Sequence, residues 1–252
     1  MALSFNWRLI QSYLGEMACS FVFGFVVYSA NIASTLTKQA ASPVISGLAI
    51  CFSSIALIYT FVDISLAHFN PAITFAAIVF GKISIIQGLF YMIFQFLGFM
   101  IAAAVILGCF PGKSSDLLEI IRAKKIDDKV TIGEIICSEI FLTGILVYVA
   151  FAVAINAHKK KANIPTTNSE ANNAIAEEEK PDYTPFAPLT IGVTIGFLAF
   201  LGISTSGGAF NPAVVFAPVL FSGKWKDSWA YWVAEFAGGV GGAAIQYFIL
   251  SL

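Results

Sequence analysis

Two copies of the tripeptide Asn-Pro-Ala constrain the fold of this chain more than any other feature of its 252 residues. The copies are Asn70-Pro71-Ala72 and Asn211-Pro212-Ala213. Each opens an apolar stretch that is too short to cross a bilayer, because a spanning helix needs about 20 residues. Asn is a favoured helix N-cap and Pro suits the first helical position, so each copy predicts an irregular segment that turns into a short helix. Irregular backbone at membrane depth is tolerated only beside protein or a water-filled cavity, so the pair indicates a pore or a binding site.

The composition identifies a membrane protein with several spans. Hydrophobic residues make up 58% of the chain and charged residues 12%, against about 25% charged residues in ordinary soluble domains. A net charge of −1 without a basic block argues against nucleic acid as a partner. The four cysteines are isolated in apolar stretches, so we expect buried small side chains and neither metal ligands nor disulfides.

Apolar runs of about 20 residues predict six transmembrane helices. They lie roughly at 9–30, 44–66, 86–110, 132–155, 187–205 and 228–250. The two short helices, at about 70–80 and 211–221, fall between the second and third spans and between the fifth and sixth. The first run is not followed by a signal-peptide cleavage site and is expected to be an uncleaved span.

The order span, span, half-helix, span therefore occurs twice, and the residues repeat with it. Tyr91-x-x-x-Gln95-x-x-Gly98 is echoed by Tyr231-x-x-x-Glu235-x-x-Gly238. Three spans per half is an odd number, so the second half must be inverted in the membrane, and the half-helices should meet N-terminus to N-terminus near the midplane. We expect one domain over 1–252, with repeats at approximately 1–112 and 130–252. The polar segment 156–186 is predicted to be a loop between them.

These features resemble the major intrinsic protein family of aquaporins and glyceroporins over essentially the whole chain. Besides both Asn-Pro-Ala boxes, the resemblance rests on Gly15-Glu16, Ser65-x-Ala67-His68, Gln95-x-x-Gly98, Glu139 and Tyr231-Trp232. It implies an all-α membrane protein with six transmembrane helices and two re-entrant half-helices in an inverted repeat, assembled as a homotetramer with a pore in each protomer. It requires no cofactor and no metal.

The resemblance also suggests roles for the pore residues. Each half-helix carries roughly half a positive charge at its N-terminus, so the pore centre should repel cations while the Asn70 and Asn211 amides donate hydrogen bonds to water. Aquaporin-type pores are a standard example of this barrier. Glu16 and Glu139 match glutamates that brace the loops before the half-helices, and His68 matches a residue that lines or braces the cytoplasmic half of the pore.

The narrowest part of the pore departs from the water-channel pattern. An ungapped match to both boxes places the four filter positions at Ile50, Ala199, Gly208 and Val214. Orthodox water channels have an aromatic residue, a His, a small residue and an Arg there. Val214 in place of Arg removes a donor and a cationic barrier, so we expect a wider and more apolar constriction.

Two further acidic residues are harder to assign. Asp63 is expected either to be wetted at the cytoplasmic mouth or to bias the approach of cations. Glu235 occupies a position that is often Pro in the family, and the sequence suggests no role for it.

The sequence thus predicts a passive water channel of relaxed selectivity that also passes small neutral solutes such as glycerol, urea, ammonia or hydrogen peroxide. One alternative is a secondary transporter, which also uses inverted repeats but needs an ionisable group at its site. Another is a weakly conducting membrane-junction or scaffold protein. No motif places a nucleophile beside a base, so an enzyme is not expected.

The expected location is a plasma membrane or an intracellular vacuolar membrane, with lipid as the surrounding partner. The family topology puts both termini and the 156–186 loop in the cytoplasm. That orientation leaves six basic residues inside and eight outside, which runs against the positive-inside rule.

Overall fold

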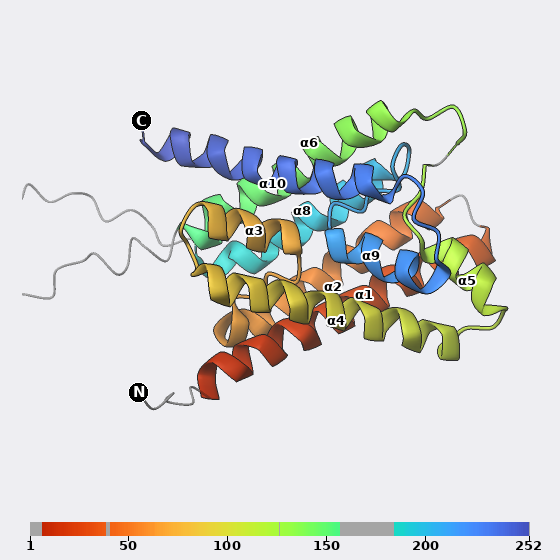
Figure 1. Ribbon diagram of the computed structural model, residues 1–252, viewed down its shortest axis with the longest axis horizontal. Coiled ribbons are helices and arrows are strands. Elements are labelled where there is room, and N and C mark those ends of the chain that lie inside the picture. The colour runs from red at the N-terminus through yellow and green to blue at the C-terminus, as the bar shows by residue number, and fades with distance from the viewer. Residues whose placement is uncertain (1–6, 39–40, 126, 157–183, 252) are drawn as a thin grey trace, which may run out of the picture.

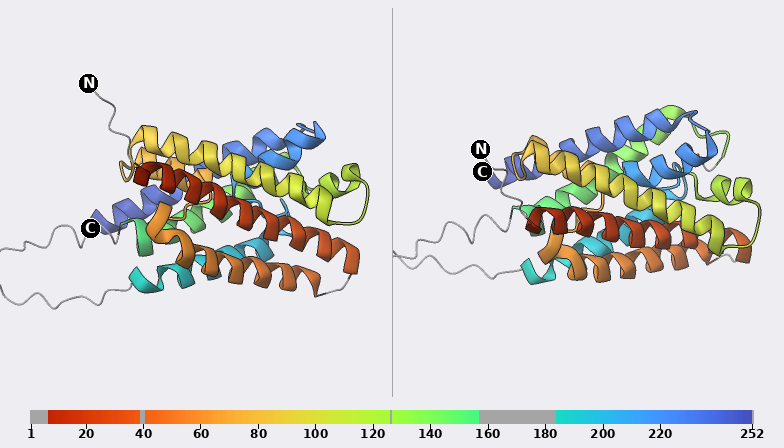
Figure 2. Two further views of the ribbon diagram at one scale, coloured as in Figure 1. Left: turned by 90° about the horizontal axis from the view of Figure 1, so that it is seen from below. Right: turned by 60° about the horizontal axis from the view of Figure 1, so that its bottom comes forward.

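A bundle of long helices surrounds two short ones in the computed structural model of the chain (Figure 1). The structure describes residues 7–38, 41–125, 127–156 and 184–251. Helix α1 begins and α10 ends at the same end of the bundle, and α5 lies at the opposite end (Figures 1 and 2). The predicted inter-repeat loop falls almost wholly on 157–183, outside the described residues.

The long helices fall where the apolar runs predict them. They are α1 (Trp7–Thr37), α2 (Ser42–Ser65), α4 (Ile85–Cys109), α6 (Ile132–Ala150), α8 (Ala187–Gly202) and α10 (Ser228–Ser251). Within the described residues, five helical segments are long and apolar enough to cross a membrane, namely α1, α2, α4, α6 with its extension to Ile155, and α8 with the turn before it. Helix α10 has 24 residues, as many as α2. The first span continues to Thr37, beyond its predicted end near residue 30.

The two short helices are α3 (Pro71–Val79) and α9 (Pro212–Ser222), and each begins one residue after its Asn. They point in opposite directions, with α3 toward the end that holds the start of α1 and α9 toward the end that holds α5 (Figure 1). Their N-termini meet inside the bundle, where Asn70 and Asn211 are 2% and 1% exposed.

The two halves pack their long helices in the same way. In the first half, α4 lies along α1, and in the second, α10 lies along α6. Gly98 and Gly238 stand at matching positions of these pairs, because a Cβ atom on either would collide with a backbone carbonyl, of Met17 and of Ile140 respectively. Small residues allow helix backbones to approach this closely in membranes, which explains why glycine recurs at both positions.

Three short elements were not predicted from the sequence. Helix α5 (Ser114–Ile121) buries Leu117, Leu118 and Ile121 against the bundle and packs on α9 and α1. A π-helical turn, η1 (Phe151–Ile155), extends α6, and a 3-10 turn, η2 (Thr184–Phe186), leads into α8. Residues of both turns line a cavity beside the loop before α3.

Candidate functional site

Asn70 and Asn211 act as the N-caps of the two short helices. The Asn70 Oδ1 accepts a hydrogen bond from the Ala72 backbone N–H at 2.9 Å, and the Asn211 Oδ1 accepts one from Ala213 at 3.1 Å. Both cap residues are extended, and the following prolines occupy the first turn, where no N–H is required. The side-chain amide nitrogens are therefore free to point away from their own helices.

The same two asparagines link the repeats to each other. The Asn70 Nδ2 donates to the Phe210 carbonyl at 2.9 Å, and the Asn211 Nδ2 donates to the Phe69 carbonyl at 2.9 Å. Phe69 and Phe210 have φ values of 31° and 32°, in a region that non-glycine residues rarely adopt. Such strain costs about 1–3 kcal/mol per residue and gathers at functional sites. Here it turns each carbonyl toward the opposite asparagine.

Two buried carboxylates hold the loops that precede the short helices. The Glu16 oxygens accept from the backbone N–H groups of His68 at 3.0 Å and Phe69 at 2.8 Å. The Glu139 oxygens accept from Ala209 at 3.1 Å and Phe210 at 2.6 Å. Both glutamates are 0% exposed. Each gives buried N–H groups the partner that they would otherwise lack, which is the geometry that a bracing role requires.

The two repeats differ in the side chains that surround these carboxylates. In the first, the Gln95 Nε2 donates to Glu16 at 2.6 Å and to Thr74 at 2.8 Å, and Thr74 also lies 3.2 Å from the His68 Nδ1. In the second, Val215 occupies the position equivalent to Thr74, so this polar chain is absent there.

Glu235 takes the place of Gln95 in the second repeat. Its Oε1 accepts from the Asn211 backbone N–H at 3.0 Å, and its Oε2 is buried without a hydrogen-bond partner among the described residues. The structure thus places an ionisable acidic group beside the tip of the second short helix. The only hint in the sequence was its alignment with Gln95.

Two tyrosines hold the second loop and its helix, and the sequence analysis did not assign them this role. The Tyr28 hydroxyl donates to the Val214 carbonyl at 3.0 Å, across 186 residues of sequence. The Tyr231 hydroxyl donates to the Ser206 carbonyl at 2.7 Å. The position of Val214 is therefore fixed through its backbone, independently of its side chain.

The four predicted filter positions lie on three helices and one loop. Ile50 is on α2, Ala199 on α8 and Val214 in the first turn of α9, and each is 6% exposed. Gly208 lies in the loop before α9 with a φ of 67°, and a Cβ atom on it would lie 3.1 Å from the Ala199 carbonyl. A larger residue at 208 would therefore be strained and crowded. All four side chains are aliphatic or absent, so this set provides no charge.

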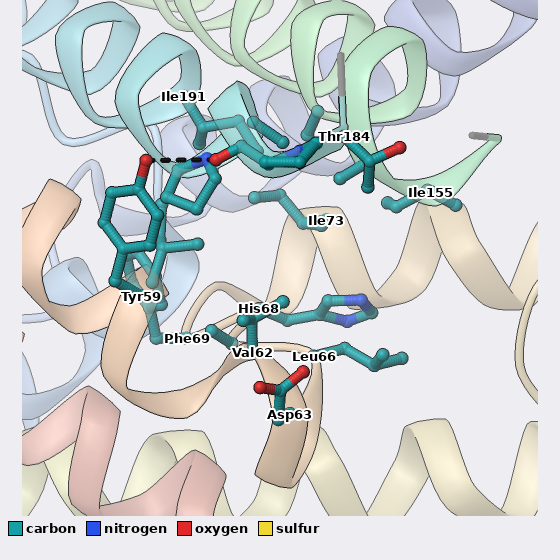
Figure 3. A pocket seen from close by; sticks show the side chains of 17 residues that line it. Tyr59, Val62, Asp63, Leu66, His68, Phe69, Ile73, Ile155, Thr184 and Ile191 are labelled. Atoms are coloured by element: carbon teal, nitrogen blue, oxygen red, sulfur yellow. Dashed lines mark hydrogen bonds between the residues drawn. The ribbon is translucent and has the colours of Figure 1, made fainter. Parts of the chain in front are cut away.

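A cavity of about 320 Å³ lies between the end of α2, the loop before α3 and the start of α8 (Figure 3). His68 and Phe69 lie on one side of the cavity, Thr184, Ile155 and Ile191 lie across from them, and Ile73 lies between the two groups (Figure 3). Asp63 lines the same cavity and is exposed, which fits both roles that the sequence left open for it. The Tyr59 hydroxyl donates to the Pro185 carbonyl at 3.0 Å and ties α2 to the turn before α8.

The arrangement provides hydrogen-bond donors and positive helix ends at a buried junction, and apolar walls elsewhere. Within the described ranges, no cluster of three or more His, Cys, Asp or Glu side chains could hold a metal ion. Such a junction can orient a small polar molecule, and the helix ends disfavour a cation.

Comparison with known proteins agrees with this description. A family model described as Major intrinsic protein matches residues 4–247. An aquaporin from Vairimorpha ceranae is 45% identical over 243 residues, which cover 96% of each chain. Aquaporin-B from Dictyostelium discoideum is 41% identical, over 96% of this chain and 84% of its own length. In structure, the chain is similar to the aquaglyceroporin from Plasmodium falciparum, with a TM-score of 0.73, 18% identity and 95% of each chain covered.

Proposed function

Because this chain belongs to the major intrinsic protein family, a family of membrane channels and not of enzymes, we propose that it is a passive water channel that also passes small neutral solutes. The observation that best supports this function is the pair of asparagine amides at the meeting point of the two short helices. An amide nitrogen has two hydrogens, and each asparagine gives only one of them to the opposite loop. The second remains for a permeating molecule.

The path of the permeant follows from the buried groups. A molecule that enters beside Asp63 crosses the cavity between His68 and Ile191 and then reaches the asparagine pair. Beyond the pair it passes Val214, Ala199, Gly208 and Ile50. Both positive helix ends face the middle of this path, so a water oxygen turns toward them and a cation is disfavoured.

Relaxed selectivity follows from the side chains of the four filter positions. Ala199 and Gly208 add little bulk, and Val214 has neither the length nor the charge of an arginine. The relatives named above are an aquaporin and an aquaporin-B, and the solved structure is of an aquaglyceroporin, so both water and glycerol deserve direct tests. We propose glycerol, urea, ammonia and hydrogen peroxide as further permeants.

The test is stopped-flow light scattering on liposomes that contain the purified protein. An osmotic step with an impermeant solute measures water flux, and steps with glycerol or urea measure entry of the solute. We expect both fluxes to exceed those of protein-free vesicles and to be unaffected by a proton gradient. Solute uptake that depends on such a gradient would instead favour a secondary transporter, with Glu235 as the ionisable group. Fluxes equal to those of protein-free vesicles would favour a scaffold.

We also propose that the protein is a homotetramer with one pore in each subunit, as the family resemblance implies. The cavity and the asparagine pair are each built from residues of a single chain. Assembly would therefore cover apolar helix faces without completing the pore.

A further inference from the structure

A second cavity, of about 630 Å³, lies at the α5 end of the bundle, and none of the four predicted filter residues lines it. It is enclosed by the segment after α5, the start of α6 and the segment that joins α9 to α10. Basic side chains in its wall exceed acidic ones by five to three. The basic residues are Arg122, Lys124, Lys125, Lys224 and Lys226, and the acidic residues are Glu119, Asp128 and Asp227.

One carboxylate forms salt bridges with three of these cations. Glu119 lies 2.9 Å from the Arg122 Nη2, 3.0 Å from the Lys124 Nζ and 2.8 Å from the Lys224 Nζ. A single negative charge cannot neutralise three positive ones, so positive charge remains in the cavity wall. The other two cations are offset in number by Asp128 and Asp227, so the wall keeps a net charge of +2, with Lys226 exposed at the rim.

One nitrogen of the Arg122 guanidinium faces the protein interior without a hydrogen-bond acceptor among the described residues. Its Nε is buried and has no hydrogen-bond partner in the described part of the chain. A buried donor without an acceptor is costly, and the planar fork of an arginine is suited to phosphate oxygens. An anion of phosphate type in the cavity would therefore find in Arg122 a guanidinium that Glu119 uses only through its Nη2.

The position of the cavity indicates where that anion comes from. Trp225 lines the cavity, and Trp225 and Trp229 are 46% and 53% exposed at this end of the helices. Exposed tryptophans gather at the level of lipid headgroups. An anion at this depth is most simply part of a lipid of the leaflet at the α5 end, which the family topology makes the non-cytoplasmic one.

We propose that this cavity binds the phosphate of an anionic phospholipid headgroup, through Arg122 at its base and Lys226 at its rim. Lys224 is shared between the phosphate and Glu119. None of the four filter positions lines the cavity, so failure of this site would leave the proposed function intact.

Native mass spectrometry of the detergent-purified full chain tests this proposal, because it gives a dissociation constant for each bound lipid. The probes are phosphatidylglycerol, phosphatidylcholine and inorganic phosphate. One cation near a membrane surface contributes about a fivefold preference for anionic lipid. We expect Lys226→Gln and Arg122→Gln each to weaken phosphatidylglycerol binding by about this factor, with little change for phosphatidylcholine.

Lys113→Gln is the matched control, because Lys113 precedes α5 at the same end of the molecule and does not line the cavity. It removes the same charge and is expected to leave the preference unchanged. Equal losses in Lys113→Gln and Lys226→Gln would overturn the proposal, as would equal affinity of the wild type for both lipids. Inorganic phosphate that binds as tightly as phosphatidylglycerol would assign the site to a soluble anion and overturn the lipid assignment. Lys226 is exposed, so its variant reports on the site even if Arg122→Gln fails to fold.

Discussion

At the scale of single residues, buried carboxylates near the asparagine pair hold the backbone of the second loop in place. Glu139 holds two backbone N–H groups of the second loop, and Glu235 holds that of Asn211. The sequence predicted the first of these roles, because a carboxylate in a span must find partners inside the protein. It did not predict the second, because no local pattern connects residue 235 with residue 211.

Replacing Glu139 by Ala should destabilise the second loop. Two buried N–H groups would lose their acceptor, at about 1–3 kcal/mol each. We expect a lower unfolding temperature in detergent and a reduced water flux, with a smaller effect for Glu139→Gln, which keeps one acceptor oxygen. An unchanged unfolding temperature in Glu139→Ala would show that these hydrogen bonds contribute little.

Replacing Val214 by Arg should restore a charged constriction. The Val214 carbonyl is held by Tyr28, so the backbone is expected to stay in place while the new side chain narrows the path. We expect glycerol and urea fluxes to fall much more than water flux, and Ala199→His to strengthen the effect by filling the remaining gap. Val214→Leu controls for added bulk without charge. If all three fluxes fall by the same factor, the filter lies at other residues.

At the scale of elements, short helices and turns depend on contacts that are distant in sequence. The two Asn-Pro-Ala helices were predicted within about one residue of their observed starts, because an N-cap followed by Pro is a strong local signal. Helix α5 was missed because its eight residues are amphipathic and lie in a polar stretch. Its anchor, Glu119, pairs with Lys224 across 105 residues, which a single sequence does not reveal.

The salt bridges of Glu119 predict how the stability of the folded protein depends on pH. Hydrogen bonds from Lys224, Arg122 and Lys124 lower the pKa of Glu119 to about 2, from an ordinary value of 4.5. A carboxyl group whose pKa is lower in the folded protein stabilises it above the ordinary pKa, and this contribution disappears as pH falls toward the folded value. The pairs are partly exposed, so together they contribute about 1 kcal/mol.

We therefore expect Glu119→Gln to unfold at a lower temperature than the wild type at pH 7, with a difference that shrinks between about pH 4.5 and pH 2. Asp116→Asn is the control, because Asp116 lies on the same helix and bonds only to its neighbour Ser115 among the described side chains. A Glu119→Gln difference that is the same at pH 7 and at pH 3 would contradict the charge-based account.

At the scale of the whole molecule, the repeat explains both what was predictable and what was not. Its inverted order could be derived from the count of spans between the two Asn-Pro-Ala boxes. The hydrogen bonds between Asn70 and Phe210 and between Asn211 and Phe69 could not be derived from the sequence. They depend on positive φ angles at Phe69 and Phe210, for which the sequence has no local signal. The permeating solutes depend on side-chain packing at four positions and remain a proposal.

The proposed tetramer makes a simple prediction for the purified protein. Light scattering with detergent subtracted should give four times the chain mass of 27.0 kDa. The flux per chain should not change with assembly, because each pore is built from a single chain. A stable, fully conducting monomer would contradict the tetramer and leave the channel proposal untouched.

The central claim is that water crosses the membrane between the two asparagines. It is tested most directly by the water flux of liposomes that contain equal amounts of wild-type protein and of Asn211→Leu, with insertion checked by protease protection. Leucine lacks the amide that caps α9 and donates to the Phe69 carbonyl, and it adds apolar bulk at the junction. The account predicts that the variant inserts and that its water flux falls to that of protein-free vesicles. An inserted Asn211→Leu protein that conducts water at the wild-type rate would contradict it.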